Sequence, residues 1–272
     1  MRKFNVILLH VGLIVVGIIT VFPFVWMLLS AFKPNSEIRA LDQTLIPREW
    51  TFENFLNIQD KFDFMQLFAN SVILSVVITA ICIYTSCIAG FVLGKYSFRG
   101  RGVLFGFILS TMMIPWAVTI FPRYTMFSAA ELKGSWLSII IPALFSGFGI
   151  FMMKQSMDSI PDSVLEAARI DGASELYIFH RIVLPMSGNS ISAFAIFQFL
   201  WVWEDYLWPY LMIDDDKLQV LAVGLTTFNG RYATDFGGLF AATTLSIVPV
   251  LTVYLIFQRR FIAGAASAAV KG

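Results

Sequence analysis

Long apolar stretches separated by short polar segments dominate the pattern along this chain. Six of them approach or exceed the length of about 20 residues that an α-helix needs to cross the hydrocarbon core of a bilayer. These stretches cover residues 4–32, 68–94, 103–121, 136–153, 188–213 and 237–257. The pattern therefore predicts an all-α membrane protein with six transmembrane helices. No linker, tandem repeat or low-complexity tract divides the chain, so we expect a single domain over residues 1–272.

The composition supports a membrane protein and excludes an ordinary soluble domain. Apolar residues make up 58 % of the chain and charged residues only 14 %, whereas about a quarter of the residues in a soluble domain are charged. The net charge of +1 gives no indication of a nucleic-acid partner. Cys82 and Cys87 have no second pair and no neighbouring His, so we expect two buried thiols rather than a metal site or a disulfide.

The first apolar stretch begins with MRKF, which is also typical of a cleaved signal peptide. Its apolar run exceeds 20 residues and lacks a clear small-x-small cleavage site. We therefore expect a retained membrane anchor.

Basic residues in the short loops predict the orientation, because such loops carry an excess of Lys and Arg on the cytoplasmic side. Residues 94–102 hold Lys95, Arg99 and Arg101 without an acidic residue, and both ends of the chain are also basic. Alternation across six spans places these segments on one side together with residues 154–185, and residues 33–67, 123–135 and 214–236 on the other. We expect a multi-pass membrane protein with both termini in the cytoplasm.

A charged segment, SIPDSVLEAARIDG, opens the longest predicted cytoplasmic loop. Ser159 fits the N-cap of a helix with Pro161 in the first turn, and Gly172 is a natural place for that helix to stop. A second short helix should start at Ser174 and end before Pro185, because a helix usually ends before the residue preceding proline. The loop thus predicts two short helices joined at a glycine.

The first of these helices has little apolar area of its own, which comes from Val164, Leu165, Ala168 and Ile170. We therefore expect it to need a surface to pack against, such as the groove of a partner protein. The alternative is an amphipathic connector that rests on lipid headgroups. A DNA-binding helix-turn-helix is disfavoured by the acidic residues of the segment, which are Asp158, Asp162, Glu166, Asp171 and Glu175.

The same segment resembles the EAA motif of the inner-membrane permease subunits of binding-protein-dependent ABC importers. The match covers EAARIDGA and IVLP, at Glu166, Ala167, Ala168, Asp171, Gly172, Ala173, Ile182, Leu184 and Pro185. Other stretches resemble the carbohydrate-uptake branch of that family, in particular its maltose-type second permease. These are FPFVWMLLSAFKP, KYSFRGRG, FLWVWEDYLWPYLMI and FQRRFIAGAASAAVKG.

The resemblance implies the fold of a type I ABC importer permease, with residues 158–185 as a coupling segment that docks in a cleft of an ATPase subunit. On this basis Glu166 and Asp171 supply charged contacts, Gly172 supplies the bend, and Ala167, Ala168 and Ala173 allow close packing. The implied partners are a homologous second permease, two ATPase subunits, an extracellular sugar-binding protein and membrane lipid. The chain has no G-x-x-x-x-G-K-[ST] phosphate loop. ATP and Mg²⁺ are therefore expected on the ATPase subunits, and this chain is not expected to be an enzyme.

Two carboxylates interrupt the fifth apolar stretch, inside FLWVWEDYLWPYLMI. An ionisable side chain within a span is costly and is by default a candidate functional group. Aromatic rings that stack on sugar C–H faces, together with carboxylates that accept from hydroxyls, would form a sugar path. The candidates are Trp203, Glu204, Asp205, Tyr206 and Trp208. The alternative is a set of interfacial aromatic residues with a carboxylate that braces a neighbouring helix or gates the outer opening.

Three other functions remain open on the residues alone. A gradient-driven secondary transporter would use Glu204 and Asp205 as coupling groups. An ABC importer permease for glycerol phosphate, a polyol or an amino acid would share the EAA motif. A non-transporting scaffold of a membrane enzyme complex would need no membrane-embedded carboxylate, and therefore agrees less well with the sequence.

Overall fold

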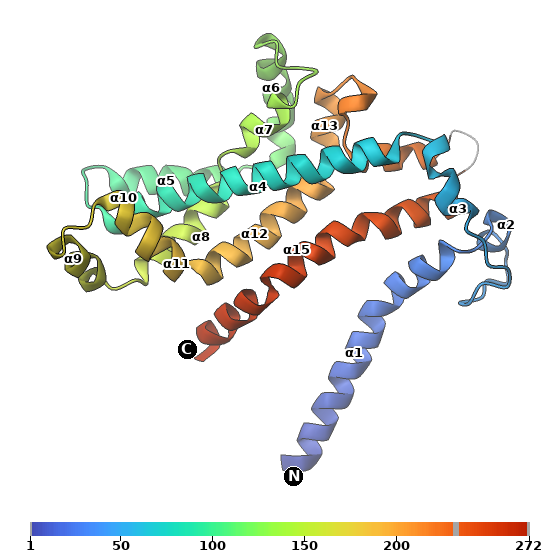
Figure 1. Ribbon diagram of the computed structural model, residues 1–272, viewed down its shortest axis with the longest axis horizontal. Coiled ribbons are helices and arrows are strands. Elements are labelled where there is room, and N and C mark those ends of the chain that lie inside the picture. Colours follow the sequence, from blue (N-terminus) through green and yellow to red (C-terminus); the bar gives the residue numbers. More distant parts are fainter. Residues whose placement is uncertain (1, 231–233, 271–272) are drawn as a thin grey trace. The chain divides into compact units, whose positions relative to one another are not determined.

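The computed structural model describes residues 2–230 and 234–270, and these are nearly all helical (Figure 1). The pairing of Asn229 with Thr234 is an isolated bridge, and no strand forms in the described ranges. Four helical segments are long and apolar enough to cross a membrane, and the number rises to six if each of two bent helix pairs is one span. The predicted all-α membrane fold is confirmed.

The four long spans lie in α1 (Arg2–Ser30), α4 (Phe64–Lys95), the pair α7 (Leu137–Ala143) and α8 (Gly147–Asp158), and α15 (Phe236–Val270). The bent pairs are α5 (Arg101–Met112) with α6 (Trp116–Ala129), and residues 175–186 with α12 (Gly188–Glu204). Short elements connect them: α2 (Asn35–Ile38), α3 (Glu53–Leu56), η1 (Asn57–Asp60), α9 (Asp162–Ile170), α10 (Glu175–Ile178), the π-helix η2 (Phe179–Val183), α11 (Leu184–Met186), α13 (Leu207–Met212), η3 (Asp216–Leu218), α14 (Leu221–Gly224) and η4 (Leu225–Phe228).

Three of the predicted continuous spans are broken in the structure. The stretch 136–153 is divided between α7 and α8, because Ser146 is extended, with ψ 115°. In the stretch 103–121, α5 and α6 meet at an angle of 99° around Pro115, whose ψ of 133° is not helical. A proline also disfavours helical backbone at the residue before it, which explains the break. In the stretch 188–213, α12 ends at Glu204 because Asp205 is extended, with ψ 114°. The prediction of one uninterrupted helix is therefore wrong in all three stretches.

The described chain forms two compact units, one from residues 1–66 and 224–248 and the other from residues 67–223 and 249–272. In the first unit, buried Asn54 joins two neighbouring segments, because its amide donates to the carbonyls of Ala31 and Lys33 at 2.8 Å each. Asn35 donates to Asp235 Oδ1 at 2.8 Å and so links α2 to the start of α15. The single-domain assignment over residues 1–272 stays a prediction.

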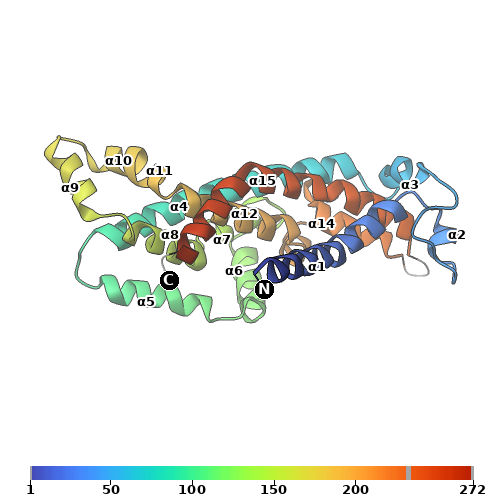
Figure 2. The same cartoon turned by 90° about the horizontal axis from the view of Figure 1, so that it is seen from below.

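The second unit holds the candidate functional segments and has two hydrophobic cores. One surrounds α8 and the end of α4, and Gly90 permits this packing, since a Cβ there would lie 2.7 Å from Met153 Cβ. Cys82 and Cys87 are buried free thiols in this core, as predicted. The other core includes Trp208 and lies near α7 and α13. Figure 2 places α9 and α10 at one end of α4, and α7 farther along the same helix.

Candidate functional site

The coupling segment begins with a proline rather than with the predicted serine cap. Pro161 is the N-cap residue of α9, and no side chain caps this end. Ser159 instead ends α8, and its hydroxyl donates to the carbonyl of Ser156 at 2.7 Å. The prediction for Ser159 is therefore wrong. Pro161 has an extended ψ of 133°, so the helix starts directly after it.

Gly172 ends α9, as the sequence predicts. Its φ is +82°, in the left-handed region that glycine adopts without a steric penalty. The Gly172 N–H donates to the carbonyl of Arg169 at 3.0 Å, and the Ala173 N–H donates to that of Ala168 at 2.9 Å. This pair of bonds is a Schellman motif, which satisfies the last carbonyls of the helix and reverses the chain.

The second short helix starts after Ser174, whose hydroxyl accepts from the Tyr177 N–H at 3.3 Å. This start was predicted, but the predicted end before Pro185 is wrong. The chain continues from α10 through η2 into α11, which contains Pro185. A local π turn is one of the adjustments that let a proline continue a helical path.

The inner side of the segment packs on its own chain. Leu165 is buried in the same core as Ile178, Phe179 and Met153. Val164 and Ala168 also pack against this core. The chain itself thus provides the surface that α9 was expected to need on this side, and docking of the segment to a partner stays a prediction.

Polar contacts fix the segment to the end of α4, and we call them the α4 anchor. The Lys95 ammonium donates to the Ile160 carbonyl at 2.5 Å and to Asp162 Oδ1 at 2.7 Å, and its side chain is only 4 % exposed. The hydrogen bond and charge of Lys95 hold the pKa of Asp162 below its ordinary value. The Tyr96 hydroxyl donates to Glu175, which also accepts from Arg169 Nε at 2.7 Å.

The outer side of the segment is exposed and mixes apolar and acidic residues. Ile170 is 86 % and Leu176 72 % exposed. Four of the predicted coupling residues are exposed (Glu166, Ala167, Asp171 and Gly172), and two are half-buried (Ala168 and Ala173). Glu166 and Ile170 are four residues apart and so share one face of α9. The segment therefore has one side fixed to the chain and one side available to a partner.

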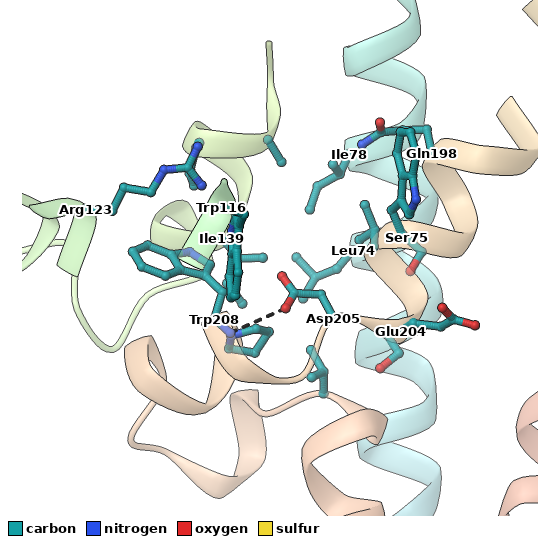
Figure 3. Close-up of a pocket in the computed structure, with 17 residues that line it drawn as sticks. Leu74, Ser75, Ile78, Trp116, Arg123, Ile139, Gln198, Glu204, Asp205 and Trp208 are labelled. Carbon is teal, nitrogen blue, oxygen red and sulfur yellow. Dashed lines mark hydrogen bonds between the residues drawn. The ribbon is translucent and has the colours of Figure 1, made fainter. Parts of the chain in front are cut away.

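A pocket of about 550 Å³ lies in the second unit (Figure 3). This volume is within the range of small-molecule sites. Its walls combine three indoles, two carboxylates, one guanidinium and several neutral polar groups. These come from Trp116, Trp201, Trp208, Glu204, Asp205, Arg123, Gln198 and Ser75.

The break after α12 places Asp205 at this pocket. Figure 3 shows its carboxylate pointing into the pocket, with Arg123 on the opposite wall. Asp205 Oδ1 accepts from the Trp208 N–H at 3.4 Å, and the Trp208 indole donates to the Ser138 carbonyl at 2.9 Å. Buried Ser75 lines the same pocket, and its hydroxyl has no hydrogen-bond partner among the described residues.

The five candidate path residues do not all reach this pocket. Asp205 and Trp208 line it, and so does Glu204, although the Glu204 carboxylate points away from it (Figure 3). Trp203 is buried instead between Phe68 and Phe199, with ring centroids 5.8 and 5.9 Å away. Tyr206 is exposed beside Tyr210.

Sequence reasoning missed the opposite wall and the α4 anchor. Trp116 and Arg123 come from α6, far along the chain from Asp205. Lys95 was used to predict orientation and Tyr96 was assigned no contact, although Lys95 is a buried contact of Asp162. For metals, no group of three or more His, Cys, Asp or Glu side chains occurs in the described ranges.

Comparison with known proteins identifies the class. Residues 86–266 match the family described as "Binding-protein-dependent transport system inner membrane component". This match includes the coupling segment and the residues that line the pocket from α6 and α12. The chain belongs to this family of ABC transporter permeases, which are transporter subunits and not enzymes, and the resemblance seen in the sequence is confirmed.

Particular relatives are similar over almost their whole length. The arabinooligosaccharides transport system permease protein AraQ of Halalkalibacterium halodurans is 33 % identical, over 97 % of this chain and 96 % of the relative. The diacetylchitobiose uptake system permease protein NgcG of Streptomyces coelicolor is 33 % identical, over 95 % and 86 %. The sn-glycerol-3-phosphate transport system permease protein UgpE of Escherichia coli (strain UTI89 / UPEC) is 30 % identical, over 97 % and 96 %.

A solved structure shares the fold. A chain of a bacterial ABC transporter involved in the import of the acidic polysaccharide alginate superposes with a TM-score of 0.83. It is 20 % identical in sequence, and the match covers 96 % of this chain and 97 % of that one. The predicted permease fold is thereby confirmed.

Proposed function

We propose that this chain is the permease subunit of an ATP-driven importer that receives a sugar or oligosaccharide from an extracellular binding protein. The observation that carries the proposal is the coupling segment, with its inner side fixed to α4 and its outer side exposed. Family membership supports the transporter class, and the names of AraQ and NgcG support an oligosaccharide as the cargo.

The assembly proposed around the chain contains a homologous second permease and two ATPase subunits, which bind ATP and Mg²⁺. The coupling segment and both termini face the cytoplasm, as the basic loops predict, and residues 33–67 face the binding protein in a bacterial inner membrane. Lys271, one of the basic residues used for this orientation, lies outside the described residues.

Coupling would follow from differential binding. The two ATPase subunits approach each other when they bind ATP, and each holds the coupling segment of one permease. The closed ATPase pair binds one of two conformations of the membrane helices more tightly than the other. The difference between these two binding free energies stabilises that conformation, so nucleotide binding selects it. The α4 anchor would transmit this displacement, because it ties the segment directly to a long span.

The pocket would form part of the translocation path for an uncharged sugar. Indoles offer flat apolar faces to the C–H groups of a sugar ring, while Asp205 and Gln198 offer polar groups to its hydroxyls. The similarity to UgpE makes glycerol phosphate the second candidate. It is less well supported, because the Asp205 carboxylate that points into the pocket offsets the guanidinium of Arg123 and leaves no excess of positive charge to hold an anion.

We expect Asp205→Asn to weaken sugar transport more than Glu204→Gln. A hydrogen bond to a charged acceptor contributes about 1.5–3 kcal/mol of binding free energy. Its loss corresponds to a roughly 10- to 100-fold rise in the half-saturating sugar concentration. Glu204→Gln is the matched control, since it is a neighbouring carboxylate that points away from the pocket. Sugar-stimulated ATPase activity in nanodiscs measures the effect. Equal responses of the two variants would remove the pocket from the path.

The proposed function itself is tested by co-purification. The tagged chain, co-expressed with its transporter partners and gently solubilised, should bring an ATPase subunit with it. Ile170→Asp should abolish this, because it places a charge on the exposed side of α9. Leu41→Asp, at a fully exposed leucine in segment 33–67, should not. Uptake that follows a proton or sodium gradient without ATP hydrolysis would instead identify a secondary transporter.

A further inference from the structure

A second cavity, in the unit formed by residues 1–66 and 224–248, belongs to neither the pocket nor the coupling segment. Its volume is about 380 Å³, and it lies where the end of α1, α2 and the start of α15 meet. Two cations line it, Lys33 and Arg39, and no acidic residue does. Ser30 and Gln43 add a hydroxyl and an amide to the same wall. The cavity is therefore positively charged and rich in hydrogen-bond donors.

Lys33 is a buried cation that forms no ion pair in the described residues, although Glu37 lies close enough to feel its charge. The residue is 2 % exposed, and in the described part of the chain no carboxylate lies within ion-pair distance of its ammonium. The ammonium donates to the Thr44 carbonyl and lies 5.0 Å from the centroid of the Trp26 ring. Nearby Glu37 accepts from Thr44 Oγ1 at 3.2 Å and from the Arg48 N–H at 3.1 Å, and it does not line the cavity. An unpaired buried ammonium is costly, so this site favours an anion.

Arg39 provides the second cation of the cavity. Its guanidinium donates to the Thr234 carbonyl and lies 5.8 Å from the centroid of the Phe236 ring. No ion pair occupies it in the described residues, so donors remain for a ligand. A phosphate is well suited to a site with one guanidinium and one ammonium, because both form charge-assisted hydrogen bonds to its oxygens.

The surroundings indicate that the anion carries a hydrocarbon part. The cavity lies at the ends of two apolar spans, since Val6–Ser30 ends at it and Phe236–Ile262 begins at it. Phospholipid headgroups occupy this depth. Trp26, Phe236 and Phe240 complete its walls, and Phe22 and Val25 are exposed on the adjoining turns of α1. Tryptophan and basic side chains at the end of a span are typical of contacts with headgroups.

We propose that this cavity binds a phosphate group presented by an anionic phospholipid. The phosphate contacts Lys33 and Arg39, and the acyl chains follow the apolar surface of α1. A bound lipid would join the end of α1 to the start of α15, two segments 200 residues apart that are also linked through Asn35 and Asp235. The proposal concerns this chain alone and does not depend on the identity of the transported solute.

The test uses the full chain in nanodiscs that contain phosphatidylglycerol or only phosphatidylcholine. Native mass spectrometry should detect retained phosphatidylglycerol, and Arg39→Gln should weaken its binding about tenfold, the effect of one charge-assisted hydrogen bond. Lys33→Met should have at least the same effect. Arg48→Gln is the matched control, since Arg48 lies in the same segment, pairs with Asp42 at 2.8 Å and does not line the cavity.

Lys33 is buried, so Lys33→Met could unfold the chain. The thermal stability of each variant in phosphatidylcholine discs shows whether that variant is folded. Arg39→Gln alone is sufficient for the test. Phosphatidylglycerol should raise the melting temperature of the wild type and of Arg48→Gln, but not of Arg39→Gln. Equal retention of lipid by Arg39→Gln and Arg48→Gln would overturn the proposal. An equal rise produced by inorganic phosphate in phosphatidylcholine discs would assign the cavity to a soluble anion and also overturn it.

Discussion

Gly172→Val should abolish ATP-driven uptake while leaving expression and membrane insertion intact. Gly172 has φ +82°, and a non-glycine residue in the left-handed region costs about 1–2 kcal/mol, more when its side chain is β-branched. No heavy atom lies within 4 Å of a Cβ built at this position, so the loss would arise from the backbone and not from a clash within the chain. Relief of this strain would break the bond from the Ala173 N–H to the Ala168 carbonyl and would turn α10 away from α9.

Two further variants separate this effect from general destabilisation. Gly172→Asn should retain most of the uptake, since asparagine tolerates the left-handed region. Gly134→Val places the same strain in another loop, at φ +82° and again with no atom within 4 Å of the new Cβ. Uptake into proteoliposomes, with the amount of inserted chain measured in parallel, gives the comparison. Equal losses in Gly134→Val and Gly172→Val would refute a special role for the bend.

The sequence predicted most of the helices because their signals are local. A run of apolar residues is enough to identify α1, α4 and α15. The stop of α9 at Gly172 and the start of α10 after Ser174 were also predicted correctly, since a left-handed glycine and a serine cap act within a few residues. The EAA motif gave the family for the same reason, as it lies within a single segment.

The breaks in the spans depend on the surroundings and were not predictable from hydropathy. Pro115 and Pro142 occur in similar apolar stretches, yet the turn at Pro115 reaches 99°, while Pro142 stays inside α7. Asp205 ends α12 in an extended conformation, and its carboxylate accepts from the N–H of Trp208. These outcomes depend on which neighbouring groups satisfy the freed backbone atoms, and a single sequence does not contain that information.

The pocket and the α4 anchor combine residues that are distant in the sequence. Arg123 and Asp205 are 82 residues apart, with α7 to α12 between them, and meet only through the fold. Lys95 and Asp162 are 67 residues apart. Sequence reasoning assigned Lys95 to a cytoplasmic charge cluster, which is the usual state of a loop lysine. Its burial follows from the packing of α8 and α9 against the end of α4, which no local pattern indicates.

Lys95→Met should uncouple the transporter without releasing the ATPase subunits. Lys95 holds the segment through the Ile160 carbonyl and Asp162, while the exposed residues Glu166 and Ile170 are unchanged by this substitution. Methionine fills a similar volume but leaves the Ile160 carbonyl without its donor. The unsatisfied carbonyl destabilises the docked position of the segment on α4 by about 1–3 kcal/mol. We expect the ATPase subunits to co-purify and hydrolyse ATP, with about tenfold less sugar transported per ATP.

Lys154→Met is the matched control, because its ammonium pairs with Asp158 within α8 and lies 4.9 Å from the centroid of the Phe105 ring of α5, and neither contact involves α4 or α9. Sugar uptake and phosphate release measured on the same proteoliposomes give the ratio. The pKa of Asp162 is lowered by Lys95, so the ion pair contributes fully above about pH 5 and weakens only as the pH falls through the depressed pKa. The ratio in the wild type should therefore be constant from about pH 6 to pH 8. Loss of the ATPase subunits from Lys95→Met would mean that the anchor shapes the docking surface rather than transmitting its motion.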